Sequence, residues 1–105
     1  MSDTKENRVD IRTVRQQIDD LDDEILRLLN QRMLLVQEIA GLKRQAGKDP
    51  LDLDREQSIF RRLARQNRGP LAWGAVKKIF GEILAASRDM QSYLGTGDQQ
   101  PPRRG

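Results

Sequence analysis

Two cations interrupt an apolar row near the middle of this sequence, and they are the side chains best placed to do chemistry. Arg32 stands where the spacing of its neighbours calls for a core residue, and Lys43 follows eleven residues later. Eleven residues bring an α-helix round to nearly the same face, ~16 Å along its axis. Both cations would therefore point towards an interior, where a charge is costly unless it is paired. Such a pair can clamp carboxylates, although one buried cation can also fix the register of a coiled coil.

Polar residues gather at two further places. Ser87 takes a position in an apolar row, and Gln91 lies one helical turn beyond it. Asp52, Arg55 and Glu56 follow the spacing i, i+3, i+4, which puts acid, base and acid on one helix face. Each group has a plain structural explanation: small-residue packing, a solvent-facing side chain near a helix end, and an N-terminal cap. Taken together, three helices with inward hydrogen-bonding groups and an excess of cations predict a pocket for a small dianion.

The composition limits the chemistry that such a pocket could support. The 105 residues include neither cysteine nor histidine, which excludes disulfides, cysteine nucleophiles, Ser-His catalysis and the usual thiolate and imidazole metal sites. We therefore expect no metal and no cofactor. The sequence has no run of 18 apolar residues and no apolar core near its N-terminus, so we expect a cytoplasmic protein with no membrane partner.

The charge balance suggests anionic partners without choosing among them. The formal net charge is +3, from 19 basic and 16 acidic residues. One basic block, formed by Arg61, Arg62, Arg65 and Arg68, contains no acid. We interpret it as a solvated helix face, because nucleic-acid binding would require interleaved aromatic residues or a known module, and the sequence has neither. No nucleic-acid partner is expected.

The elements that must position these residues are helical, and the first is long. Its apolar row comprises Ile11, Val14, Ile18, Leu21, Ile25 and Leu28, and resumes with Leu35, Ile39 and Leu42. This heptad spacing predicts one helix of about 33 residues, a rod of about 50 Å. A compact domain of 100 residues has a radius of gyration of only ~13 Å, so one short chain cannot cover the rod. We therefore predict a homodimer in which two long helices share one core.

The predicted dimer bears on the site. Arg15 precedes Arg32 by seventeen residues, ~25 Å along the same helix. A small ligand bound at Arg32 could therefore meet Arg15 only from the partner chain. The predicted pocket would therefore be complete only in the predicted dimer.

Two shorter helices follow the long one. The turn signal at 47–50 ends the first helix, a second is predicted from about 53 to 66, and a third from about 73 to 94 after a break at 67–70. The apolar positions expected to face inward on these helices are Ile59, Phe60, Leu63, Trp73, Val76, Phe80, Ile83, Met90 and Leu94. The fold class is therefore all-α, with one helical domain at 11–94. It lies between a polar tail at 1–10 and a Gly/Pro-rich tail or linker at 95–105.

These residues resemble the active-site series of the all-helical chorismate mutase family over roughly residues 11–94. The matching positions are Arg15, Arg32, Lys43, Asp52-x-x-Arg55-Glu56, Ser87 and Gln91. The stretch IRTVRQQIDDLDDEILRLLNQR is similar to the family's long first helix, and NRGPL with IFGEILAAS resembles versions fused to prephenate dehydratase. The departures are Gly74 and Gly81, unusual inside a helix, and Met33, where some relatives have a second arginine.

The resemblance implies an intertwined homodimer that rearranges chorismate to prephenate. This pericyclic reaction needs no nucleophile, metal or obligatory proton transfer, so the missing cysteine and histidine are no obstacle. The enzyme must hold a flexible dianion in its compact conformer and stabilise the charge that develops as the ether bond breaks. By resemblance, Lys43 and Gln91 would donate to the ether oxygen, and Glu56 would accept from the ring hydroxyl.

The remaining matched residues would bind the substrate. By resemblance, Arg32 and Arg15 from the other protomer would hold the two carboxylates, and Ser87 would assist one of them. Asp52 and Arg55 would complete the wall near the hydroxyl.

Two other functions stay open at this point. Isochorismate pyruvate lyase shares the fold, the arginines and the lysine, although Asp52-x-x-Arg55-Glu56 with Ser87 is more similar to the mutase. A non-catalytic helical dimer that serves as an interaction module is the alternative from a different class.

Overall fold

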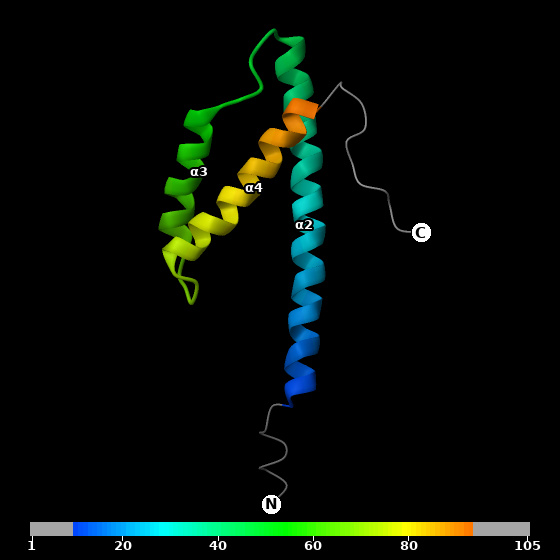
Figure 1. Cartoon of the computed structure of the whole chain (residues 1–105), viewed down its shortest axis with the longest axis vertical. Helices are drawn as coiled ribbons and strands as arrows, with labels where there is room; N and C mark the ends of the chain where they lie inside the picture. The colour runs from blue at the N-terminus through cyan, green and yellow to red at the C-terminus, as the bar shows by residue number, and fades with distance from the viewer. Residues whose placement is uncertain (1–9, 94–105) are drawn as a thin grey trace, which may run out of the picture. The chain divides into compact units, whose positions relative to one another are not determined.

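The computed structural model describes residues 10–93, with the side chain of Tyr93 excepted, as three α-helices and no strand (Figure 1). The helices are α2 (Ile11–Gln45), α3 (Leu53–Gln66) and α4 (Trp73–Tyr93). This confirms the all-α class, the long first helix and the predicted bounds of the second helix. Leu94 and both predicted tails, apart from Asp10, lie outside the described residues. No helix in the described part of the chain is long and apolar enough to cross a membrane.

Helix α2 begins and ends with recognisable capping structures. The Asp10 carboxylate accepts a hydrogen bond from the backbone N–H of Arg12 at 3.2 Å, which satisfies one free donor of the first turn. At the other end, Gly47 has φ +71°. The backbone N–H of Gly47 donates to the Arg44 carbonyl at 3.0 Å, and that of Lys48 donates to the Lys43 carbonyl at 2.7 Å. These bonds form a Schellman motif, which reverses the chain immediately after the helix.

The chain divides into two compact units, Met1–Arg32 and Met33–Gly105. In the first unit, every described side chain from Asp10 to Leu28 is exposed. The row that the heptad spacing predicts as a shared core is among them, with Ile18 50%, Leu21 62% and Ile25 53% exposed. Local polar contacts are present on this part of the helix, such as the ion pair of Glu24 with Arg27. The chain by itself therefore leaves the first part of the predicted row uncovered.

The second unit has its own core. The buried apolar residues are Ala40 of α2, Ile59 of α3, and Val76 and Leu84 of α4. The part of α2 that belongs to this unit packs against α4, since Gln37 Nε2 lies 3.2 Å from Met90 Sδ and Ser87 Oγ lies 3.9 Å from Met33 Sδ.

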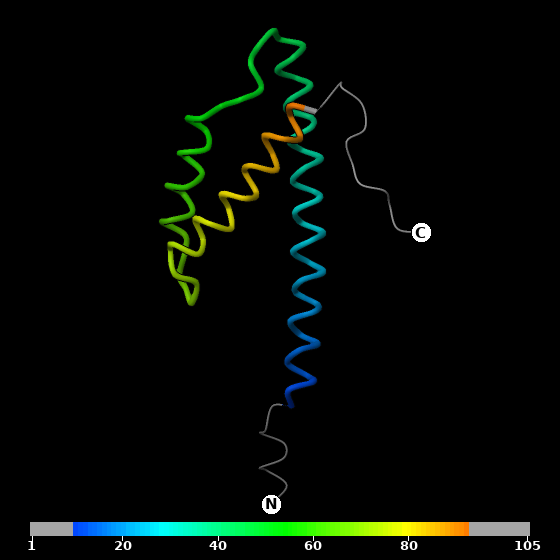
Figure 2. Tube along the Cα trace, viewed as in Figure 1, coloured from blue at the N-terminus to red at the C-terminus, as the bar shows by residue number. Residues whose placement is uncertain are grey.

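Helices α3 and α4 pack against each other, and the connecting turn is visible in the Cα trace (Figure 2). Phe60 and Trp73 meet edge to face, with ring centroids 6.4 Å apart. Asn67 ends α3 and shapes the turn: its amide donates to the Leu71 carbonyl at 3.0 Å and its oxygen accepts from the Gly69 N–H at 3.1 Å. This pairing fixes where α4 starts, and so where the polar residues near its C-terminal end lie.

Candidate functional site

Lys43 lies in the last turn of α2. The chain reverses after this helix, so the loop that follows returns to the Lys43 side chain. Its Nζ donates to the Pro50 carbonyl at 3.4 Å and lies 3.8 Å from Asp52 Oδ2. The Lys43 side chain is 25% exposed. A half-buried ammonium group between a carbonyl and a carboxylate is held in one region but keeps donor capacity, because an ammonium group carries three N–H bonds.

Asp52 has two roles in this corner, one for each carboxylate oxygen. Its Oδ1 accepts from the backbone N–H of Arg55 at 2.9 Å, which makes it the N-cap of α3, and its Oδ2 faces Lys43. The capping explanation of the acid-base-acid cluster is therefore confirmed. Arg55 itself is exposed, and its described contact here is made by its backbone.

Glu56 follows on the first turn of α3 and forms an ion pair that the sequence analysis did not foresee. Its Oε1 accepts from Arg88 Nη1 of α4 at 2.6 Å, and the side chains are 21% and 39% exposed. The pair joins the first turn of α3 to the later part of α4. An ionised carboxylate at a helix N-terminus is favoured by the helix dipole as well as by the arginine.

Ser87 and Gln91 differ in how far they match their plain explanations. Ser87 is buried, and its hydroxyl donates to the Ile83 carbonyl of the preceding turn at 3.0 Å. Both observations fit small-residue packing, the structural explanation of this serine, and its role towards a ligand stays a prediction. Gln91 is half-buried rather than solvent-facing. Both side chains belong to the unit that holds Lys43 and Glu56.

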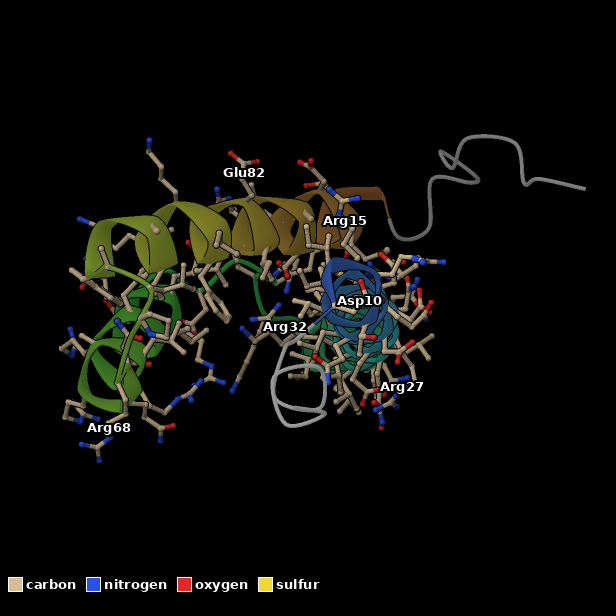
Figure 3. All side chains as sticks on the ribbon, turned by 90° about the horizontal axis from the view of Figure 1, so that it is seen from below. Asp10, Arg15, Arg27, Arg32, Arg68 and Glu82 are labelled. Atoms are coloured by element: carbon tan, nitrogen blue, oxygen red, sulfur yellow. The ribbon has the colours of Figure 1, made fainter. Side chains whose placement is uncertain are left out.

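Arg15 and Arg32 belong to the other unit, Met1–Arg32. Arg15 is exposed and Arg32 is half-buried. Viewed end-on along α2, Arg15, Arg27 and Arg32 leave the helix in three different directions (Figure 3). Arg15 and Arg32 of one chain therefore do not converge on one small ligand. Their grouping with Lys43 and the other matched residues stays a prediction.

The structure thus gathers part of the predicted set and adds residues to it. It brings Lys43 to Asp52, and it places Glu56 one helical turn beyond Asp52. Sequence reasoning missed Arg88 and Gln37, which contact Glu56 and Met90. The partners are separated by 32 and 53 residues, so no helical spacing could have paired them. The only available signal was that Arg88 directly follows a serine already singled out.

The chemistry open to this corner is recognition of oxygen atoms. Lys43 offers N–H donors and a positive charge, and Glu56 offers a carboxylate acceptor. Lys43 can therefore bind an electron-rich oxygen, and Glu56 can accept a hydrogen bond from a hydroxyl group. Groups of these kinds can bind and orient a ligand and stabilise developing negative charge without forming a covalent bond to it.

Comparisons with known proteins identify relatives of the chain. The family model described as chorismate mutase type II matches residues 14–92. A bifunctional chorismate mutase/prephenate dehydratase from Aquifex aeolicus is 33% identical over 95 residues, covering 82% of this chain and 26% of that protein. A protein of the same description from Neisseria gonorrhoeae is 37% identical over 86 residues, covering 77% and 23%. The chain therefore spans about a quarter of the length of the curated relatives it matches.

A solved structure is also similar. The chorismate mutase (form II) from Thermus thermophilus superposes with a TM-score of 0.76 at 38% sequence identity, covering 78% of this chain and 93% of that one. The likeness therefore extends over nearly the whole of a solved chorismate mutase chain.

Proposed function

The chain belongs to the type II chorismate mutase family, and on that premise we propose that it rearranges chorismate to prephenate. One observation carries the proposal: the family match runs over residues 14–92, which include every position of the polar series from Arg15 to Gln91. We infer that residues 11–94 form the catalytic domain.

The reaction needs conformational restraint and electrostatic stabilisation more than reactive groups. Chorismate is a flexible dianion, and its rearrangement breaks an ether bond while a carbon–carbon bond forms. Holding the compact conformer and placing donors at the ether oxygen lowers the barrier without a nucleophile. A cytoplasmic location, and work without a cofactor, stay predictions.

Lys43 is proposed to supply the main electrostatic contribution. Its half-buried ammonium group is held by the Pro50 carbonyl and the Asp52 carboxylate, so little reorganisation is needed when charge develops on a nearby oxygen. Gln91 would donate to the same ether oxygen, and Glu56 would accept from the ring hydroxyl.

The carboxylates of the substrate are proposed to be bound by arginines from two chains. Arg32 would hold one carboxylate with help from Ser87, and Arg15 of a second copy would hold the other. Asp52 and Arg55 would line the wall near the hydroxyl. The different directions of Arg15 and Arg32 in one chain support a second copy as the source of Arg15 (Figure 3).

The exposed row on α2 supports the same intertwined homodimer. Of the large apolar residues exposed in the described chain, Leu21, Leu28 and Leu35 are 62%, 49% and 57% exposed. They share the heptad spacing with further exposed residues from Ile11 to Leu42. A long apolar row of this spacing is the usual contact face of paired helices.

The test is an absorbance assay of the purified chain with chorismate, followed by identification of the product. We expect loss of the chorismate signal with prephenate as product. Lys43→Ala should lower the rate by ~10²–10³, as for loss of a donor aimed at developing charge. Lys48→Ala, which removes an exposed lysine from the following turn, should retain the rate.

The outcomes separate the alternatives. Conversion of isochorismate to salicylate and pyruvate, without turnover of chorismate, would identify a lyase and overturn the mutase proposal. No turnover of either compound would favour a non-catalytic helical dimer. Full activity of Lys43→Ala would remove Lys43 from the mechanism.

A further inference from the structure

The ion pair between Glu56 and Arg88 joins two helices of the second unit, and the proposed mechanism does not use it. Arg88 Nη1 donates to Glu56 Oε1 at 2.6 Å, a short charge-assisted hydrogen bond. The two side chains are 21% and 39% exposed, so the bond is partly shielded from water. It connects α3 and α4 at the residue that the mechanism assigns to the substrate hydroxyl.

The geometry leaves Glu56 able to bind a ligand. The bond uses Oε1, and among residues 10–93 no hydrogen bond to Oε2 is present. A free glutamate samples several rotamers, because its side chain has three rotatable bonds. Anchoring one oxygen removes most of that freedom and keeps the other oxygen as an acceptor.

The far end of the contact is itself held in place. Arg88 directly follows Ser87, which is buried and bonded to the Ile83 carbonyl. The start of α3 is held by the Asp52 cap. The bond therefore connects two fixed backbone segments. Because both ends are fixed, the bond restricts where the Glu56 carboxylate can lie.

We propose that Arg88 is a positioning residue that holds the Glu56 carboxylate in place to accept a hydrogen bond from the hydroxyl group of a cyclic dicarboxylate substrate. The inference rests on the proposed function. Part-exposed ion pairs usually contribute little to folding stability, so the pair is expected to matter more for the ligand than for the fold.

The kinetic effect should fall mainly on KM. The hydroxyl is not a reacting atom, so its bond to Glu56 is made in the ground state and in the transition state alike, and such uniform binding appears in KM. Arg88→Met should raise KM for chorismate by about tenfold and change kcat by less than about threefold. Arg88→Lys, which keeps a donor and the charge, should recover most of the loss.

A double-mutant cycle distinguishes positioning from a structural effect. If Arg88 acts through Glu56, then Arg88→Met should add no further loss in a Glu56→Gln background. Lys78→Met removes one positive charge from an exposed position of the same helix and should leave KM and kcat unchanged. Unfolding midpoints measured by circular dichroism show whether each variant is folded. If Arg88→Met does not fold, the cycle is measured with Arg88→Lys in the Glu56→Gln background instead.

The same cycle should be measured by calorimetry with a bicyclic dicarboxylate that carries the hydroxyl and mimics the compact transition state. Losses that add in the double variant, or unchanged KM in folded Arg88→Met, would overturn the role of Arg88 while leaving the mutase proposal intact. Coupled losses in binding without any turnover would overturn the mutase proposal and keep the positioning role. Neither turnover nor binding by the unmodified chain would overturn both.

Discussion

The two units of the chain treat their apolar residues in opposite ways. In Met33–Gly105, Ala40, Ile59, Val76 and Leu84 are buried by other helices of the same chain. In Met1–Arg32, every described side chain up to Leu28 is exposed, although the heptad row there is as regular as any in the sequence. A regular apolar row therefore predicts a contact face, but it does not tell whether the same chain covers that face.

The energetic side of this difference is large. Full burial of one leucine or isoleucine side chain contributes about 1.5–3 kcal/mol. The first unit leaves several such side chains in water. In addition, no large side chain is completely buried anywhere in the described residues. A second copy that covers the row would therefore supply much of the stability that the single chain lacks.

The largest expected effect follows from placing a charge in the exposed row. Leu21→Asp should dissociate the proposed dimer and lower chorismate turnover by more than ~10³, because a buried carboxylate without a partner is strongly unfavourable and Arg15 of the second copy is lost. Sedimentation velocity and the absorbance assay measure the two effects. Thr13→Asp adds the same charge outside the row and should preserve both properties. An active dimeric Leu21→Asp protein would show that the row is not the interface.

A smaller effect is expected from the core of the second unit. Leu84 is 3% exposed, so Leu84→Ala should lower the free energy of unfolding by about 2–4 kcal/mol. Denaturant titration measures the change, with Ile79→Ala as the control at a position that is 48% exposed. Equal losses at Leu84 and Ile79 would contradict the view that this unit has its own core.

The smallest effect is expected at the ion pair of the first unit. The pKa of Glu24 lies below its ordinary value because Arg27 donates hydrogen bonds to it and places a positive charge beside it. A depressed pKa in the folded state contributes stability above the unfolded pKa, and this is lost as pH falls through the folded value. Both side chains are more than half exposed, so Glu24→Gln should lower the unfolding midpoint only slightly at pH 7 and not at all near pH 2.

The contrast between the units also shows how far the sequence leads. The end of α2 and the bounds of α3 were predictable because Gly47, Asp52 and Asn67 are turn and capping residues with clear local signals. The face of α2 that packs within the chain was not. Met33 and Ala40 lie between members of the heptad row, and nothing local distinguishes a face covered by α4 from one left exposed.

The candidate site divides along the same line. Lys43 stood out because it shares a face with Arg32, and its loop contact with Asp52 is local. Arg88 could not be paired with Glu56 from spacing, because the two residues lie on different helices. Contacts within a turn follow local rules, whereas contacts between helices depend on packing that a single sequence does not specify.

The turn at Gly47 has a further consequence for the order of assembly. Lys43 and Asp52 are nine residues apart, and a loop of about ten residues closes in ~10–100 ns. Association of two chains is slower and depends on concentration. During refolding, the contact between Lys43 and Asp52 should therefore form early and within each single chain. Turnover should return only when two chains associate. Dilution would then delay the recovery of activity without delaying the recovery of helix.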